Sequence, residues 1–490
     1  MLLVRADGQA GTIEACLAQS RGASRLMDRL AFPGGKLKVG AALPASSLFC
    51  RPHIQHAHDC PIRAVMRAAT LTATMSQCLG AGSRRRIRAL CRQIVDGRDG
   101  QGFGALTMKI LATLPTKGRD LRLDLFRGVA NWGIFLDHIP NNIVNWVTTR
   151  NYGFSDAADL FIFISGYTVA FVFARMWLER GFVIGATRLL KRVWQIYVAH
   201  VFLFVLYLAE IGYVAQRSGN SGFTDDFNIR GFLANPAQFL FEGLILRFKP
   251  VNMDVLPLYI VLMGVFPPIL WLMLRRPNMT LTASALLYVM ARRFGWNLSA
   301  YPTGLWYFNP FAWQFLFTFG AWFALGGSAQ AMPFIRSRTA LVLGISYLLF
   351  ALVMTMAARF DELRELIPPE VYGAFNPNDK TNLAPYRLLH FVVFAFFVVR
   401  LLPRDWPGLE WAIFRPAIKC GQQSLEVFCS GIFLSFAAHV ALVEVSGAIW
   451  MQIVVSIVGI LMMTVLAYYR SWSKRVDKAP KAKPAVVAAG

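Results

Sequence analysis

The chain has 490 residues, of which 56% are hydrophobic and only 16% are charged. A soluble domain is nearer to a quarter charged, and here the apolar residues gather in blocks of about 20, the length that crosses a hydrocarbon core of about 30 Å, so an ordinary soluble protein is excluded. The formal net charge of +23 comes mostly from basic residues that flank these blocks, which indicates membrane topology and contact with anionic membrane lipid, with no nucleic-acid partner.

Residues 1–107 differ from the rest of the chain, because they are rich in Arg, Ala, Gly and Ser and contain no spanning block. We predict a poorly ordered N-terminal extension, and we hypothesise that it is an over-extended start or a dispensable leader, since Met108 opens a plausible beginning before the first span. One cluster has spacing that suits a metal, but no second ligand cluster completes it, so we predict no metal site. Its members are His53, His56, His58 and Cys60.

The apolar blocks within residues 108–472 predict an all-α, polytopic integral membrane domain with about ten transmembrane helices. A basic cytoplasmic tail is predicted over 473–490. The ten predicted spans are 126–147, 157–177, 192–215, 254–275, 279–295, 309–327, 338–359, 384–402, 419–442 and 447–469.

Lysine and arginine concentrate before the first span, in every second connection and in the tail. The positive-inside rule therefore predicts that both ends of the chain are cytoplasmic. The long polar connections 216–253 and 360–383 are then predicted on the outer side. Arg292 and Arg293, near the outer end of the fifth span, go against this trend.

The first span carries a pair of ionisable residues on one face. Arg127 and His138 are eleven residues apart, which returns them to nearly the same side of a helix with a rise of about 16 Å between them. An arginine at the cytoplasmic mouth suits the phosphates of an acyl thioester, and a deeper histidine suits removal of a proton from an acceptor hydroxyl. Asp124, one turn before Arg127, is placed to fix its direction. The alternatives are a basic anchor for Arg127 and a packing role for His138.

The outer ends of other spans offer candidate substrate-binding residues. Arg387 and His390 share one face at the outer end of span eight, where the arginine is placed to bind a carboxylate on the acyl group or to neutralise an oxyanion. An interfacial anchor is the alternative for Arg387. The remaining candidates are Asp159 at the outer end of span two, Asp254 as a helix N-terminal acid, and Lys380 and Asn382 in an outer loop that faces a polar acceptor.

Two motifs resemble a known superfamily. "RLDLFRGVANWGIFLDH" resembles the opening motif of the acyltransferase-three superfamily, in which a Leu-Asp-x-x-Arg-Gly run is followed by a histidine, and "DLFIFISGY" resembles its second-span motif. More narrowly, "NMDVLPLYIVLMGVFPP", "WYFNPFAWQFLF", "DKTNLAPYRLLHF" and "CGQQSLEVFCSGIFLS" resemble the OpgC family, whose members succinylate osmoregulated periplasmic glucans. The resemblance covers about residues 119–470.

This resemblance implies a bacterial inner-membrane protein of about ten spans. It implies succinyl-CoA or a similar acyl-CoA as the cytoplasmic donor substrate, a glucan hydroxyl as the outer acceptor, and no bound cofactor. The matched catalytic histidine is His138, and the matched donor-side arginine is Arg127. Two other classes remain open: a transporter or flippase that uses the same charges for a solute path, and a sensor or scaffold without chemistry.

Overall fold

The computed structural model describes residues 2–6, 13–17, 112 and 120–477. Contacts divide the chain into two units, Met1–Leu106 and Thr107–Gly490. In the first unit, strand β1 (Leu2–Ala6) pairs antiparallel with β2 (Ile13–Leu17). Both strands lie outside residues 108–472, for which the all-α membrane domain was predicted. Nearly all of the predicted poorly ordered extension, including the histidine cluster, lies outside the described residues.

In the second unit, the elements described within residues 120–477 are helical. The first half contains α4 (Leu121–Asp137), the 3₁₀ helices η2 (Ile143–Val147) and η3 (Thr149–Asn151), α5 (Ala157–Arg180), α6 (Phe182–Ser218), α7 (Gly222–Asp226), α8 (Arg230–Ala234), α9 (Pro236–Leu244), α10 (Val255–Arg275) and α11 (Pro277–Phe294). The second half contains α12 (Pro310–Trp322), the π-helix η4 (Phe323–Gly327), α13 (Ser328–Arg336), α14 (Arg338–Ala357), α15 (Asp361–Glu365), α16 (Pro369–Phe375), α17 (Pro385–Leu401), the 3₁₀ helices η5 (Pro407–Glu410) and η6 (Ala412–Phe414), α18 (Arg415–Gln422), α19 (Ser424–Glu444) and α20 (Ile449–Val476).

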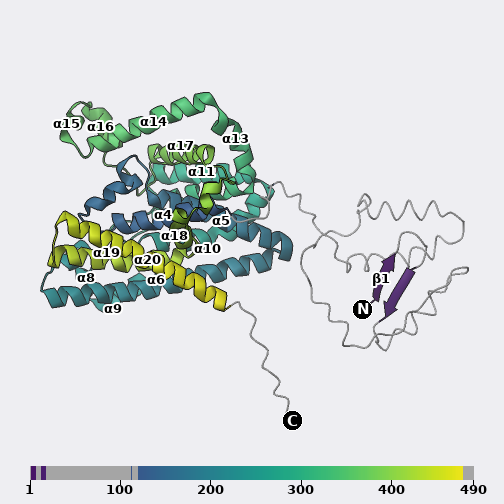
Figure 1. Ribbon diagram of the computed structural model, residues 1–490, viewed down its shortest axis with the longest axis horizontal. Coiled ribbons are helices and arrows are strands. Elements are labelled where there is room, and N and C mark those ends of the chain that lie inside the picture. The colour runs from purple at the N-terminus through teal and green to yellow at the C-terminus, as the bar shows by residue number, and fades with distance from the viewer. Residues whose placement is uncertain (1, 7–12, 18–111, 113–119, 478–490) are drawn as a thin grey trace, which may run out of the picture. The chain divides into compact units, whose positions relative to one another are not determined.

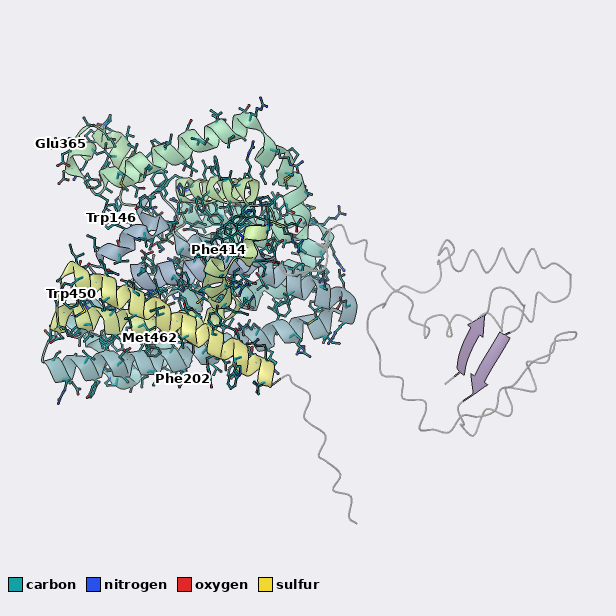
Figure 2. All side chains as sticks on the ribbon, viewed as in Figure 1. Trp146, Phe202, Glu365, Phe414, Trp450 and Met462 are labelled. Carbon is teal, nitrogen blue, oxygen red and sulfur yellow. The ribbon has the colours of Figure 1, made fainter. Side chains whose placement is uncertain are left out.

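Six helices within residues 120–477 are long and apolar enough to cross a membrane: α5, α6, α10, α14, α19 and α20. Their outward side chains, such as Phe202 on α6 and Trp450 and Met462 on α20, are large, apolar and exposed (Figure 2). This composition fits a multi-pass membrane protein. Each predicted span overlaps a helix, but α4, α11, α12 and α17 are shorter or more polar than these six, so the count of ten stays a prediction.

The first, sixth and ninth predicted spans differ from the observed helices. The sixth, 309–327, is kinked at Leu325 and Gly326, whose backbone angles are not helical. The first was expected to reach residue 147, but α4 ends at Asp137 because Pro140 has no N–H to donate and Asn141 adopts a left-handed φ of 57°. The ninth was expected to be continuous from residue 419. It is broken at Gln423, where φ is −114° and ψ is 36°, into α18 and α19.

Glycines bring α4 and α18 into backbone contact near the middle of the unit (Figure 1). A Cβ added to Gly128 would lie 1.8 Å from the carbonyl oxygen of Ala417, and one added to Gly421 would lie 1.8 Å from that of Asp124. Side chains have no room at either position. Small residues of this kind allow membrane helices to pack closely, and here they fix the helix that carries Arg127.

The same arrangement joins α5 to α12. A Cβ on Gly166 would lie 1.9 Å from the carbonyl oxygen of Phe317, and one on Gly320 would lie 2.2 Å from that of Phe163. No side chain larger than hydrogen fits at Gly166 without moving the backbone of α12. Because α5 begins at the cluster of charged residues described below, this contact sets the position of its first turn.

We predict that Gly166→Ala lowers the melting temperature of the purified protein in detergent, because the new methyl group forces two backbones apart. The matched control is Gly264→Ala in α10, where an added Cβ meets no atom within 4 Å. The control is expected to be neutral or slightly stabilising, since alanine favours a helix over glycine by about 1 kcal/mol. Equal melting temperatures for the two variants would contradict the close α5–α12 contact.

Candidate functional site

Arg127 lies between α4 and α5. Its Nη2 donates to Thr168 Oγ1 at 3.0 Å and, at 3.4 Å, to the carbonyl oxygen of Ile164, both on α5. The side chain is half-buried. Asp124, one turn earlier, is buried on the same helix, and its expected role in directing Arg127 stays a prediction.

His138 closes the C-terminal end of α4. Its backbone angles (φ −89°, ψ −7°) are still helical, and its N–H donates to the carbonyl oxygen of Ile134 at 3.0 Å. The helical repeat therefore extends from Arg127 to His138, with a rise of about 16 Å and an angular difference of about 20°. The two residues share one side of α4.

The imidazole of His138 has an unused nitrogen. Its Nδ1 is buried and has no hydrogen-bond partner among the described residues. The charges of Lys380, Arg150 and Asp156 act on this ring, and the carbonyl oxygen of His138 accepts a bond from Asn252 Nδ2 at 3.4 Å. A buried imidazole nitrogen without a partner is costly unless a ligand or water satisfies it, so the nitrogen is suited to accept the proton of a bound hydroxyl.

Asp156 and Asp159 lie at the start of α5. The Asp156 side chain accepts from the backbone N–H of Ala158 at 2.8 Å, and Asp159 Oδ2 accepts from the N–H of Asp156 at 2.9 Å, which is a reciprocal capping box. Both carboxylates are buried or nearly so, with exposed side-chain fractions of 0% for Asp159 and 11% for Asp156. Buried acids in this position need cationic partners.

Arg387 of α17 supplies the main cationic partner. Its Nε donates to Asp159 Oδ1 at 3.1 Å, its Nη1 donates to the carbonyl oxygen of Phe154 at 2.8 Å, and its Nη2 contacts both Asp156 and Asp159. The residue is only 2% exposed. The guanidinium ties α17 to the start of α5, because its three nitrogens are engaged by these groups. The expected role of Arg387 in substrate binding stays a prediction.

Lys380 is the more accessible cation of this cluster. Its Nζ lies 2.7 Å from Asp156 Oδ2 and 5.4 Å from the ring centre of Phe308, and 25% of its side chain is exposed. Although burial alone would raise the pKa of Asp156, the charges of Arg387 and Lys380 bring it well below its usual range. Asp156 is therefore ionised, and its carboxylate holds the ammonium group of Lys380 in place. The charges of both groups act on the ring of His138.

His390 lies one turn after Arg387 on α17 and is buried. Its Nδ1 lies 2.7 Å from Ser155 Oγ, and a Cβ on Gly153 would lie 2.0 Å from its Nε2. The ring thus packs against the segment before α5, with Phe154 at 6.0 Å between ring centres. This arrangement fixes the segment that precedes α5. The expected role of His390 in substrate binding stays a prediction.

Asn382 and Asp254 lie around the same cluster. Asn382 Oδ1 accepts from Asn309 Nδ2 at 3.0 Å, and its carbonyl oxygen accepts from Arg292 Nη1 at 2.7 Å. The unexpected outer arginine is thereby explained, because Arg292 also pairs with Asp379 at 3.1 Å. Asp254 precedes α10 and interacts electrostatically with Lys249 and Lys380.

Three residues of the site were not predicted from the sequence, namely Asp156, Ser155 and Asn252. The signal for Asp156 was its spacing of three residues from Asp159 before an apolar run, which is typical of a capped helix start. Ser155 and Asn252 carry no such signal. Within residues 120–477, no group of three or more His, Cys, Asp or Glu residues is arranged to hold a metal ion.

Comparison with known proteins gives one family match. The family model described as "OpgC protein" matches residues 119–475. No curated protein and no solved structure matches the chain.

We predict that Arg387→Met strongly destabilises the protein, by about 3–5 kcal/mol, because it leaves two buried carboxylates without their shared cation. The control is Arg230→Met, which breaks an exposed pair with Asp225 whose side chains are 70% and 45% exposed. That pair is expected to contribute less than about 1 kcal/mol. Thermal unfolding in detergent compares the two. Equal losses would show that the Arg387 pairs do not stabilise the fold.

Proposed function

The chain belongs to the OpgC protein family, a membership that implies a glucan-modifying transferase of the acyltransferase type, and from this premise we propose its reaction. The protein transfers an acyl group, of the succinyl type, from a cytoplasmic acyl-CoA to hydroxyl groups of a periplasmic glucan. It does so as a multi-pass protein of the bacterial inner membrane, with both chain ends in the cytoplasm.

The observation that carries this proposal is the buried Nδ1 of His138, which has no hydrogen-bond partner within residues 120–477 and whose ring is influenced by the charges of Lys380 and Asp156. In the proposed reaction, the imidazole takes the proton of a glucan hydroxyl while its oxygen attacks the thioester carbonyl. The new C–O bond forms, the C–S bond breaks, and the proton passes from the imidazole to the departing thiolate of CoA. No covalent acyl-enzyme is required.

Arg127 supports the donor side of the proposal. It lies on the His138 side of α4, about 16 Å nearer to the cytoplasmic end that the basic connections predict. A guanidinium there binds phosphate groups of the donor while the thioester extends toward His138. Lys380, held by Asp156, is placed to donate hydrogen bonds to the acceptor or to the oxyanion that forms on the carbonyl.

A transporter or flippase is the alternative, and one observation favours it. Gln423 interrupts the ninth predicted span, and broken helices occur at transporter binding sites. At this break, however, Gln423 bonds to Ser471 at 3.1 Å and to Lys474, so its side chain is occupied by α20. Acyl transfer by the purified protein in detergent, where no compartments exist, separates an enzyme from a transporter.

We predict that His138→Gln reduces acyl transfer to glucan by at least about a hundredfold, which is the usual contribution of a general base. The assay measures the mass of periplasmic glucans from cells that produce each variant, together with acyl-CoA consumption by the purified protein. Membrane insertion and thermal stability are expected to stay close to wild type.

The matched control is His200→Gln in α6. His200 is also a buried histidine whose ring nitrogens have no partner among the described residues, but it lies on α6, where its ring stacks with that of Phe204. Glucans from this variant are expected to carry the normal modification. The proposal fails if His138→Gln is as active as wild type, or if the two variants lose activity to the same extent.

A further inference from the structure

A groove on the side of the helical bundle runs between α13, α14 and α17. Its volume is about 430 Å³, and none of its lining residues belongs to the candidate site. The lining is almost wholly apolar and includes Phe334, Leu341, Tyr347, Leu389, Phe396 and Arg400. The one phenolic hydroxyl is already used, since Tyr347 donates to the carbonyl oxygen of Tyr386 at 2.6 Å.

The groove opens toward the membrane. α14 runs along one margin of the unit (Figure 1), and only 22% of its most apolar stretch is buried inside the protein. α17 packs beside it. Since α14 is long and apolar enough to cross a bilayer, the natural occupant of a groove along it is a molecule that is already in the bilayer.

The length of the groove matches one leaflet. Leu389 and Arg400 both line it, and they are eleven residues apart on α17, which corresponds to a rise of about 16 Å. This is about half of a hydrocarbon core of about 30 Å. A helix of a second protein would need the full thickness, whereas one acyl chain of a lipid needs only this half.

Arginines mark one end of the groove. Arg400 Nη1 donates to the carbonyl oxygens of Ile335 at 2.7 Å and Ser337 at 3.3 Å, so its guanidinium is held at the α13–α14 junction. Arg336 and Arg338 flank this junction and are exposed, and neither has an ion-pair partner within residues 120–477. The end of α17 is therefore basic at the depth where lipid headgroups lie.

We propose that this groove binds one acyl chain of an anionic phospholipid, with the lipid phosphate held by Arg336, Arg338 and Arg400. The apolar walls accept the chain, the length selects one leaflet, and the arginines select a negatively charged headgroup. This site is independent of acyl transfer, so it stands or falls separately from the proposed function.

The test titrates the full-length protein in mild detergent with phosphatidylglycerol or phosphatidylcholine and counts bound lipids by native mass spectrometry. The paired variant Arg336→Ala/Arg338→Ala is expected to bind phosphatidylglycerol about thirtyfold more weakly, at about fivefold for each arginine lost, and to bind phosphatidylcholine as before. Arg336→Lys/Arg338→Lys, which keeps both charges, is expected to retain binding.

Two further variants make the result decisive. Arg275→Ala/Arg276→Ala removes another pair of arginines, at the α10–α11 junction, and is expected to leave phosphatidylglycerol binding unchanged. Leu341→Trp fills the groove and is expected to remove the tightest lipid while leaving the melting temperature near wild type. Equal losses in the two arginine pairs, or undiminished binding in Leu341→Trp, would overturn the proposal and indicate only unspecific lipid around the protein.

Discussion

The rest of the structure depends on one buried ionic contact, in which Arg387 joins the carboxylates of Asp156 and Asp159 at the start of α5. In an apolar interior, neither a lone guanidinium nor a lone carboxylate is tolerated, so the three groups hold one another in place. The same contact ties α17 to α5 and leaves Asp156 an oxygen for Lys380. A structural ion pair thus holds in place an accessible cation, Lys380, whose charge acts on the His138 ring.

Close helix packing also fixes the positions of the helices that carry the charged cluster. Gly128 and Gly421 bring α4 against α18, and Gly166 and Gly320 bring α5 against α12, at distances that admit no side chain. Backbone contact therefore fixes both α4, which carries Arg127, and α5, which Asp156 caps. The site is built on these tightly packed helices, whereas the proposed lipid groove lies along α14, of whose most apolar stretch only 22% is buried.

The apolar blocks of the sequence predicted the positions of the long apolar helices. The helical repeat of 3.6 residues per turn predicted that Arg127 and His138 lie on the same side of α4, because both patterns are local properties of the chain. The end of α4 was wrong by ten residues, since the effect of Pro140 was given too little weight against the apolar run that follows it. The ion pairs of Arg387 were not predicted, because its partner Asp159 lies 228 residues away. Such pairing depends on tertiary contacts that a single sequence does not contain.

The most direct measurement of the central claim is a structure of the protein with a non-hydrolysable acyl-CoA analogue and a glucan fragment. The account predicts donor phosphate beside Arg127, the acyl carbonyl beyond it along α4, and a glucan hydroxyl about 3.5 Å or less from the His138 imidazole. A donor bound away from α4, or a His138 ring that faces neither substrate, would contradict it.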